Sequence, residues 1–433
     1  MSLTKSARKL HKTILIAGLI AIALSACGGG ATPQPTPPAA APATSAPQAG
    51  YPDQEIPQPQ GSYPAPADQS PAEQSTLPAQ PSYPAPEVKT GPTQTLPAVP
   101  PARGIVVYDK AAGVFHVFSV AGTNQNQDLS AQGLDIPGPN DVRVVGQSVY
   151  YYSNQDRVVY KAGASGPQAL EFTRAASAPT GFAVSADESQ IAWSKDDLQA
   201  SPAFSELWVA GIDGSNGRMV ARNESQDGSP GFLVMRPYRW TADGKLLYEQ
   251  QPVGIGGYIL FAGLNSLYQY DPASNAITTV FPPGPNPNLC LAALFPGDLS
   301  RGVFSCFPGE KNGLTFRRLP DGSLIQAVPP VEDQGTTGSA VFSPDGNSLA
   351  YAVARNDPNQ EHGQVVVVPT DLSSAPKSIA SVEPGYFSVA GWASPAQILF
   401  QRYENDRTSV WKVNSDGSDA AKIADGWFVD LIR

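Results

Sequence analysis

From Gly104 to the end of the chain, short apolar runs alternate with turn-forming residues, and no long segment has the 3.6-residue period of an amphipathic helix. The clearest unit lies at 340–351, where Asp345 and Gly346 form a turn between two apolar runs. Similar units recur at 182–193 and 238–248, and weaker ones begin near Val142, Leu291 and Phe387. Their spacing, roughly 40 to 56 residues, is typical of a four-stranded propeller blade. The pattern predicts one all-β domain over 104–433.

The two ends of this domain each carry part of a further unit. Residues 426–431 have the form of a first strand with nothing after it, whereas 104–108 and 114–118 look like a second and a third strand without a first. Joining these pieces into one blade would close the ring and remove its exposed sheet edges. We therefore expect a seven-bladed β-propeller closed by strands from both ends of the domain, with six blades as the alternative.

The unit Ser343-Pro-Asp-Gly-x-x-Leu-Ala-Tyr351 resembles the repeats of TolB-type, WD-repeat-like β-propellers, which also occur in relatives of prolyl oligopeptidases. The resemblance extends over the whole domain but is sharp in only three units. It implies that the Asp-Gly residues form blade turns, so we assign them a structural role rather than a catalytic one.

The first 26 residues have the features of a bacterial signal peptide. A basic stretch at 5–12 precedes an apolar run at 13–24, which is too short to cross a ~30 Å hydrocarbon core. Leu24-Ser25-Ala26-Cys27 matches the bacterial lipobox, which implies cleavage before Cys27 and lipidation of its thiol. A secretory signal with a chance cysteine, or an uncleaved anchor, are the alternatives. The expected location is the outer face of the cytoplasmic membrane or, in a diderm, the outer membrane.

Residues 27–103 are rich in Pro, Ala, Gln, Ser and Thr and hold almost no residues that could build a core, so we expect a disordered linker. Ser-Tyr-Pro-Ala-Pro occurs at 62–66 and again at 82–86. This repeat is consistent with a semi-rigid polyproline spacer, and a recognition motif for a proline-binding module is the alternative.

The formal net charge of the chain is −10, and it falls to about −14 without the four basic residues that precede Cys27. An acidic surface repels phosphate backbones and anionic headgroups, which argues against nucleic-acid binding and against electrostatic docking to a membrane. The lipid on Cys27 is thus the expected membrane contact, and the protein is expected to be monomeric.

Cys290 and Cys306 are the only cysteines of the predicted domain. They flank the turn at 296–298 almost symmetrically, so an antiparallel hairpin would bring them roughly opposite each other in an oxidising compartment. We predict a disulfide between them, with two buried thiols as the alternative. No cofactor, metal site or catalytic residue is predicted, because no histidine or cysteine has metal-ligand spacing and no catalytic triad motif is present.

The functional residues of propellers usually lie on one face of the ring, which carries the loops between blades and the loops between second and third strands. The loop at 250–264 belongs to this face, and its apolar run at 258–261 could be either a partner-binding lid or a β-extension of the blade. Arginine and tyrosine are frequent in binding hot spots, although exposed charges are often only solvated. The partner-binding candidates on this face are Arg236, Tyr238, Tyr258, Phe261, Arg355, Arg402 and Tyr403.

These features favour a non-catalytic lipoprotein of the cell envelope whose propeller binds a protein or a small ligand. The alternatives are an extracytoplasmic propeller hydrolase that acts on glycans or peptides, and a sensor or accessory lipoprotein of an envelope complex.

Overall fold

The computed structural model describes residues 102–119, 125–130, 141–163, 165–175, 181–225, 232–252, 263–283, 289–306, 313–319, 321–331, 335–357, 360–405 and 407–433. The predicted signal peptide, Cys27 and almost all of the predicted linker lie outside these residues. No helix among the described residues is long and apolar enough to cross a membrane.

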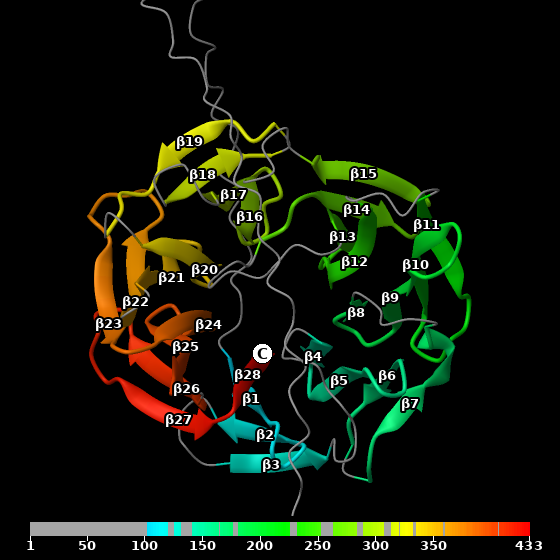
Figure 1. Ribbon diagram of the computed structural model, residues 1–433, viewed down its shortest axis with the longest axis horizontal. Coiled ribbons are helices and arrows are strands. Elements are labelled where there is room, and N and C mark those ends of the chain that lie inside the picture. Colours follow the sequence, from blue (N-terminus) through cyan, green and yellow to red (C-terminus); the bar gives the residue numbers. More distant parts are fainter. Residues whose placement is uncertain are drawn as a thin grey trace, which may run out of the picture. The chain divides into compact units, whose positions relative to one another are not determined.

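Seven four-stranded antiparallel sheets form a ring of blades, as the alternating sequence pattern predicts (Figure 1). Blade 1 consists of β28 (Trp427–Ile432), β1 (Gly104–Asp109), β2 (Val114–Ser119) and β3 (Gln125–Ser130). Blade 2 consists of β4 (Val142–Val145), β5 (Ser148–Ser153), β6 (Val158–Lys161) and β7 (Gln168–Leu170), followed by a single 3₁₀ turn, η2 (Glu171–Thr173). Blade 3 consists of β8 (Phe182–Val184), β9 (Gln190–Asp197), β10 (Ala203–Gly211) and β11 (Arg218–Ser225).

The remaining four blades follow one another along the chain. Blade 4 consists of β12 (Leu233–Trp240), β13 (Leu246–Pro252), β14 (Leu267–Asp271) and β15 (Ala276–Phe281). Blade 5 consists of β16 (Leu289–Leu294), β17 (Arg301–Cys306), β18 (Leu314–Arg318) and β19 (Leu324–Ala327). Blade 6 consists of β20 (Thr336–Phe342), β21 (Ser348–Asp357), β22 (Gln360–Pro369) and β23 (Lys377–Val382). Blade 7 consists of β24 (Tyr386–Ser394), β25 (Gln397–Glu404), β26 (Arg407–Asn414) and β27 (Ala421–Asp425).

Strands from both ends of the domain complete blade 1, which confirms the seven-bladed ring. The C-terminal strand β28 is the innermost strand of this blade and pairs antiparallel with β1, from Gly104 opposite Ile432 to Tyr108 opposite Trp427 (Figure 1). Blades 1 and 7 are also linked by a side chain, because Gln401 Oε1 accepts a hydrogen bond from the backbone N–H of Phe428 at 2.9 Å. The first and last strands of the domain therefore hold the ring closed.

The hydrophobic core is divided among the blade boundaries. Each of the seven boundaries has one apolar cluster that draws residues from both adjoining sheets. At the boundary of blades 6 and 7, for example, Ala350 and Val365 pack with Phe387, Trp392 and Phe400. Strand alternation therefore gives each blade two buried faces, one toward each neighbour.

The Asp-Gly sequences form blade turns, in agreement with their predicted structural role. Those at 243–244 and 345–346 join first and second strands, whereas those at 213–214, 321–322 and 416–417 join third and fourth strands. In blade 6 the hydroxyl of Ser343 donates to Asp345 at 2.6 Å and accepts from the backbone N–H of Ser348 at 2.9 Å. Gly346 follows with φ 71°, a conformation that glycine adopts without steric penalty. The hydrogen bonds that reach Asp345 hold the pKa of its carboxyl below the usual range, against an opposing effect of partial burial.

The register of β16 and β17 differs from the symmetric hairpin expected around the two cysteines. Near the turn, Leu294 pairs with Gly302, but a bulge between Leu291 and Ala293 shifts the pairing by one residue. Cys290 consequently faces Ser305, and Cys306 faces Leu289. Cys290 is buried, with its sulfur 3.6 Å from Oδ1 of Asn265, whereas the side chain of Cys306 lies outside the described residues. The disulfide stays a prediction, although the two cysteines are not directly opposite.

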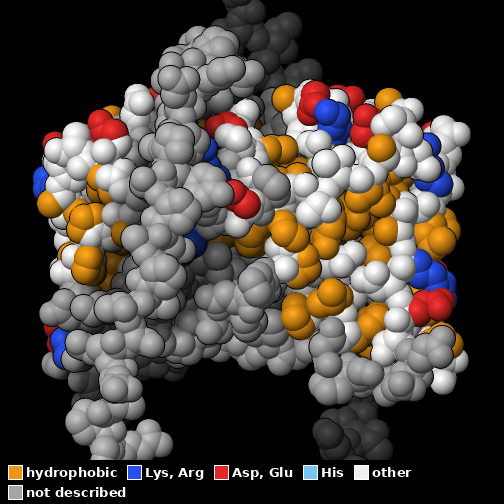
Figure 2. Space-filling model, turned by 90° about the horizontal axis from the view of Figure 1, so that it is seen from above, with side chains coloured by type: hydrophobic (Ala, Val, Ile, Leu, Met, Phe, Trp, Pro, Cys, Tyr) orange, Lys and Arg blue, Asp and Glu red, His pale blue; other side chains and the backbone are white. Residues whose placement is uncertain are grey.

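Figure 2 shows the ring from the side, where apolar side chains are interspersed with charged side chains of both signs. The outermost strands of three consecutive blades contribute exposed apolar side chains, namely Met219, Ile277, Leu324 and Ile325. No single-sign charged surface is visible on the described part of this side.

Candidate functional site: a pocket on blade 7 and a charged centre

The described residues among the predicted partner-binding set fall in separate places. Tyr258 and Phe261 lie outside the described residues, as do the other residues of 253–262. Arg402 lines a pocket on blade 7, and Arg236 lies on the innermost strand of blade 4. The structure thus gives two regions to consider, a pocket at one blade and a charged cluster near the ring centre.

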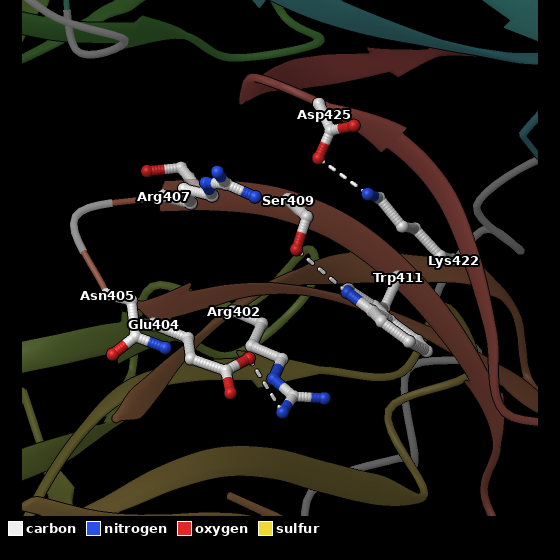
Figure 3. A pocket seen from close by; sticks show the side chains of 9 residues that line it. Arg402, Glu404, Asn405, Arg407, Ser409, Trp411, Lys422 and Asp425 are labelled. Carbon is white, nitrogen blue, oxygen red and sulfur yellow. Dashed lines mark hydrogen bonds and ion pairs between the residues drawn. The ribbon is translucent and has the colours of Figure 1, made fainter. Parts of the chain in front are cut away.

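The pocket covers the outer part of blade 7 and has a volume of about 850 Å³. It lies where β25 ends and β26 begins, which is the face of the ring predicted to carry function. Strand alternation places Arg402 and Glu404 on the same sheet face as Phe400, and Phe400 packs toward blade 6. The lining residues come from three adjacent strands and one turn: Arg402, Glu404, Asn405, Arg407, Thr408, Ser409, Trp411, Lys422 and Asp425 (Figure 3).

Two ion pairs shape the pocket. Arg402 Nη2 lies 2.7 Å from Glu404 Oε2, and Lys422 Nζ lies 2.6 Å from Asp425 Oδ1 (Figure 3). Among the described residues, no ion pair involves Arg407, which is exposed. The described lining therefore holds three cations and two carboxylates, a surplus of one positive charge.

Trp411 supplies the large aromatic surface of the pocket. Its indole Nε1–H donates to Ser409 Oγ at 2.9 Å, and its ring also contacts the apolar cluster between blades 6 and 7. The guanidinium carbon of Arg402 lies 5.5 Å from the ring centroid, within the range of a cation–π contact. The ring is therefore held in position before any ligand arrives.

Tyr403 and Arg355 do not belong to this pocket. Tyr403 lies on the opposite face of its sheet, toward blade 1, where its ring stacks on Tyr386 at 4.5 Å between centroids. Burial raises the pKa of the Tyr403 hydroxyl. Arg355 is exposed and shares a sheet face with Tyr351 and Val353, which pack toward blade 5. Alternation along β21 and β25 separates these side chains, although all of them lie near the same end of their blades.

Arg236 belongs to a chain of alternating charges around the ring centre. It is near enough to Asp141 for its charge to lower the pKa of that carboxyl, and Asp141 in turn is near Arg143 on β4. Arg143 also interacts with Asp430 on β28, which interacts with Arg433. Burial nevertheless raises the pKa of both aspartates above the usual range. Tyr238, on the same strand as Arg236, packs against the apolar cluster between blades 4 and 5.

Glu249 is another perturbed carboxyl of this region. It is 3% exposed and lies opposite Arg236 in the pairing of β12 with β13. Burial raises the pKa of Glu249 to about 7, although the positive charge of Arg236 acts in the opposite direction. Glu249 Oε2 and Arg236 Nε are buried and make no hydrogen bond within the described structure. The cost of burying the Glu249 carboxylate therefore exceeds the stabilisation that it gains from Arg236.

Sequence reasoning missed most of these groups, for different reasons. Alternation through the hairpin of β25 and β26 would have placed Trp411 on the face of Arg402, and this signal was available. No sequence pattern predicted that Arg143, Arg236 and Asp430 lie near one another, because they come from three blades that are far apart in the chain. No group of three or more His, Cys, Asp or Glu side chains in the described segments could hold a metal ion.

Comparison with known proteins places the chain by its fold. No protein-family model matches the sequence, and no curated protein matches it. Among solved structures, a putative TolB from Agrobacterium tumefaciens is 14% identical, with 76% of this chain and 91% of that chain covered and a TM-score of 0.33. A functionally unknown protein from Desulfotomaculum acetoxidans is 11% identical over 76% and 99% of the two chains, with a TM-score of 0.45.

An oligogalacturonate lyase in complex with manganese is also similar, at 10% identity over 75% of this chain and 85% of that chain, with a TM-score of 0.45. The solved structures similar to this chain thus include TolB proteins and an enzyme. The chain is an all-β, seven-bladed propeller, and the solved structures similar to it include TolB proteins.

Proposed function

We propose that this protein is a non-catalytic binding module of the cell envelope, anchored by a lipid on Cys27 and displayed on the proline-rich linker. Its propeller binds an envelope component in the pocket of blade 7.

One observation carries this proposal: the pocket is built before any ligand binds. Glu404 and the ring of Trp411 hold the guanidinium of Arg402, and Ser409 orients the indole of Trp411. Preorganised side chains lose little conformational entropy on binding, which is a condition for useful affinity. The volume of about 850 Å³ lies within the range of small-ligand sites.

Capture experiments with the full-length lipoprotein in detergent test this function. We expect the wild-type protein to retain one envelope component, and Arg407→Gln combined with Trp411→Ala to reduce its recovery at least about tenfold, because aromatic and arginine anchors dominate binding energy. Arg174→Gln is the matched control. Arg174 is half-exposed and forms an ion pair with Glu171, and both residues lie on blade 2, which does not adjoin blade 7. Equal recovery by all three proteins would refute the pocket as the binding site.

A further inference from the structure

The lining of the blade 7 pocket also indicates the chemistry of its ligand. We propose that the pocket binds a saccharide that carries a carboxylate. This inference rests on the proposed function, since it identifies the class of ligand for the same pocket.

The net positive charge of the described pocket lining favours a ligand with an anionic group. Arg402 and Lys422 each have a carboxylate partner, whereas Arg407 forms no ion pair with another described residue. Arg402 also keeps donor capacity, because its buried Nε–H makes no hydrogen bond within the described structure. A ligand carboxylate can accept hydrogen bonds from a guanidinium in a planar, two-pronged geometry. One carboxylate would balance the surplus positive charge.

The indole of Trp411 favours a ligand with a flat, weakly polar face. Trp411 is partly buried, and its only polar atom already donates to Ser409. What the ring still offers is its apolar surface, with Asn405 and Thr408 nearby in the same lining (Figure 3). A pyranose ring has a face of C–H groups that packs on such a surface and hydroxyls at its rim that bond to amides and hydroxyls.

The backbone of the pocket argues against a peptide ligand. β25 and β26 pair continuously from Gln397 opposite Asn414 to Glu404 opposite Arg407, and β26 also pairs with β27. Extended peptides are usually bound by adding a strand to a free sheet edge, whereas most of the pocket lies over β25 and β26, which are paired on both sides; only Lys422 and Asp425 come from the edge strand β27. The pocket therefore offers mainly side chains to its ligand, which suits a ligand that carries many hydroxyl groups.

Calorimetric titration of the full-length lipoprotein in detergent tests this ligand class. The probes are a trimer of glucuronic acid, the glucose trimer of the same linkage, and hexaglutamate. We expect the acidic trimer to bind at least about tenfold more tightly than the neutral one, and added salt to weaken only the acidic trimer. Arg407→Gln should reduce this preference to about threefold or less, because it removes the one cation of the lining that has no ion-pair partner among the described residues. Trp411→Phe should weaken both trimers, and Arg174→Gln should change neither.

The outcomes separate this inference from the proposed function. Equal binding of both trimers would overturn the need for a carboxylate. Tighter binding of hexaglutamate would identify an acidic peptide as the ligand class and overturn the saccharide. If no probe binds while the pocket variants still lose the captured envelope component, the saccharide is wrong and the binding module stands. Since Arg407 is exposed, its replacement tests the inference without disturbing the core.

Discussion

Deletion of residues 427–433 is expected to abolish the stable ring. This segment contains all of β28, the innermost strand of blade 1, and its removal leaves β1 with an unpaired edge. Phe428 and Leu431, each 8% exposed, would leave the apolar cluster that joins blades 1 and 7. Two lost core side chains together with a lost strand should cost more than about 5 kcal/mol. We expect a fall in Tm of more than about 10 °C, with aggregation through the open edge.

Calorimetry and size-exclusion chromatography of the full-length and shortened proteins measure this effect. Removal of Arg433 alone is the control, because this exposed residue lies beyond β28 and its removal leaves the strand and its pairing with β1 intact. It should lower Tm by only a few degrees. A shortened protein that unfolds cooperatively at the wild-type Tm would show that β28 does not close the ring.

Replacement of Glu249 by glutamine is expected to remove a pH-dependent destabilisation of about 3 kcal/mol. The pKa of this carboxyl is about 7 in the folded protein, against a usual value of about 4.3 in an unfolded chain. Between these values the unfolded chain releases its proton while the folded protein keeps it, so the free energy of unfolding falls as pH rises. The loss begins near pH 4.5 and is complete above pH 7. Glutamine cannot ionise, and its protein should not suffer this loss.

Denaturant unfolding of both proteins at pH 4.5 and pH 8 measures the difference. Relative to wild type, Glu249→Gln should gain about 3 kcal/mol of unfolding free energy between these pH values. Glu171→Gln is the matched control, because the side chain of Glu171 is 66% exposed, and its pH dependence should differ from wild type by less than about 0.5 kcal/mol. Identical pH dependence of wild type and Glu249→Gln would show that burial does not hold this carboxyl neutral.

The sequence predicts the propeller architecture because the patterns that mark its strands and turns lie within short segments of the chain. Alternating apolar runs and Asp-Gly turns mark the strands, and the incomplete units at 104–118 and 426–431 predicted how the ring closes. The Ser343 and Asp345 side chains form the turn bonds within six residues, so their role needs no knowledge of the rest of the fold. Local patterns of this kind can be recognised in a single sequence.

The sequence did not predict features that depend on strand register or on packing between blades. The bulge between Leu291 and Ala293 moves Cys290 out of register with Cys306, and nothing in the hairpin sequence marks it. Arg402 and Tyr403 were grouped as one candidate surface, but adjacent residues of a strand point to opposite sheet faces. The charges of Asp141, Arg236 and Asp430 meet only because blades 1, 2 and 4 surround the same centre.

Position-specific photocrosslinking in living cells is the most direct test of a binding pocket on blade 7. A benzophenone side chain at Asn405, an exposed residue of the pocket lining, is compared with the same group at Gln326, an exposed residue of β19 on blade 5. We predict that the full-length lipoprotein forms a defined adduct from position 405, that Arg407→Gln weakens it, and that position 326 gives none. An adduct from position 326 but not from 405, or equal adducts from both, would contradict the assignment of the binding site to blade 7.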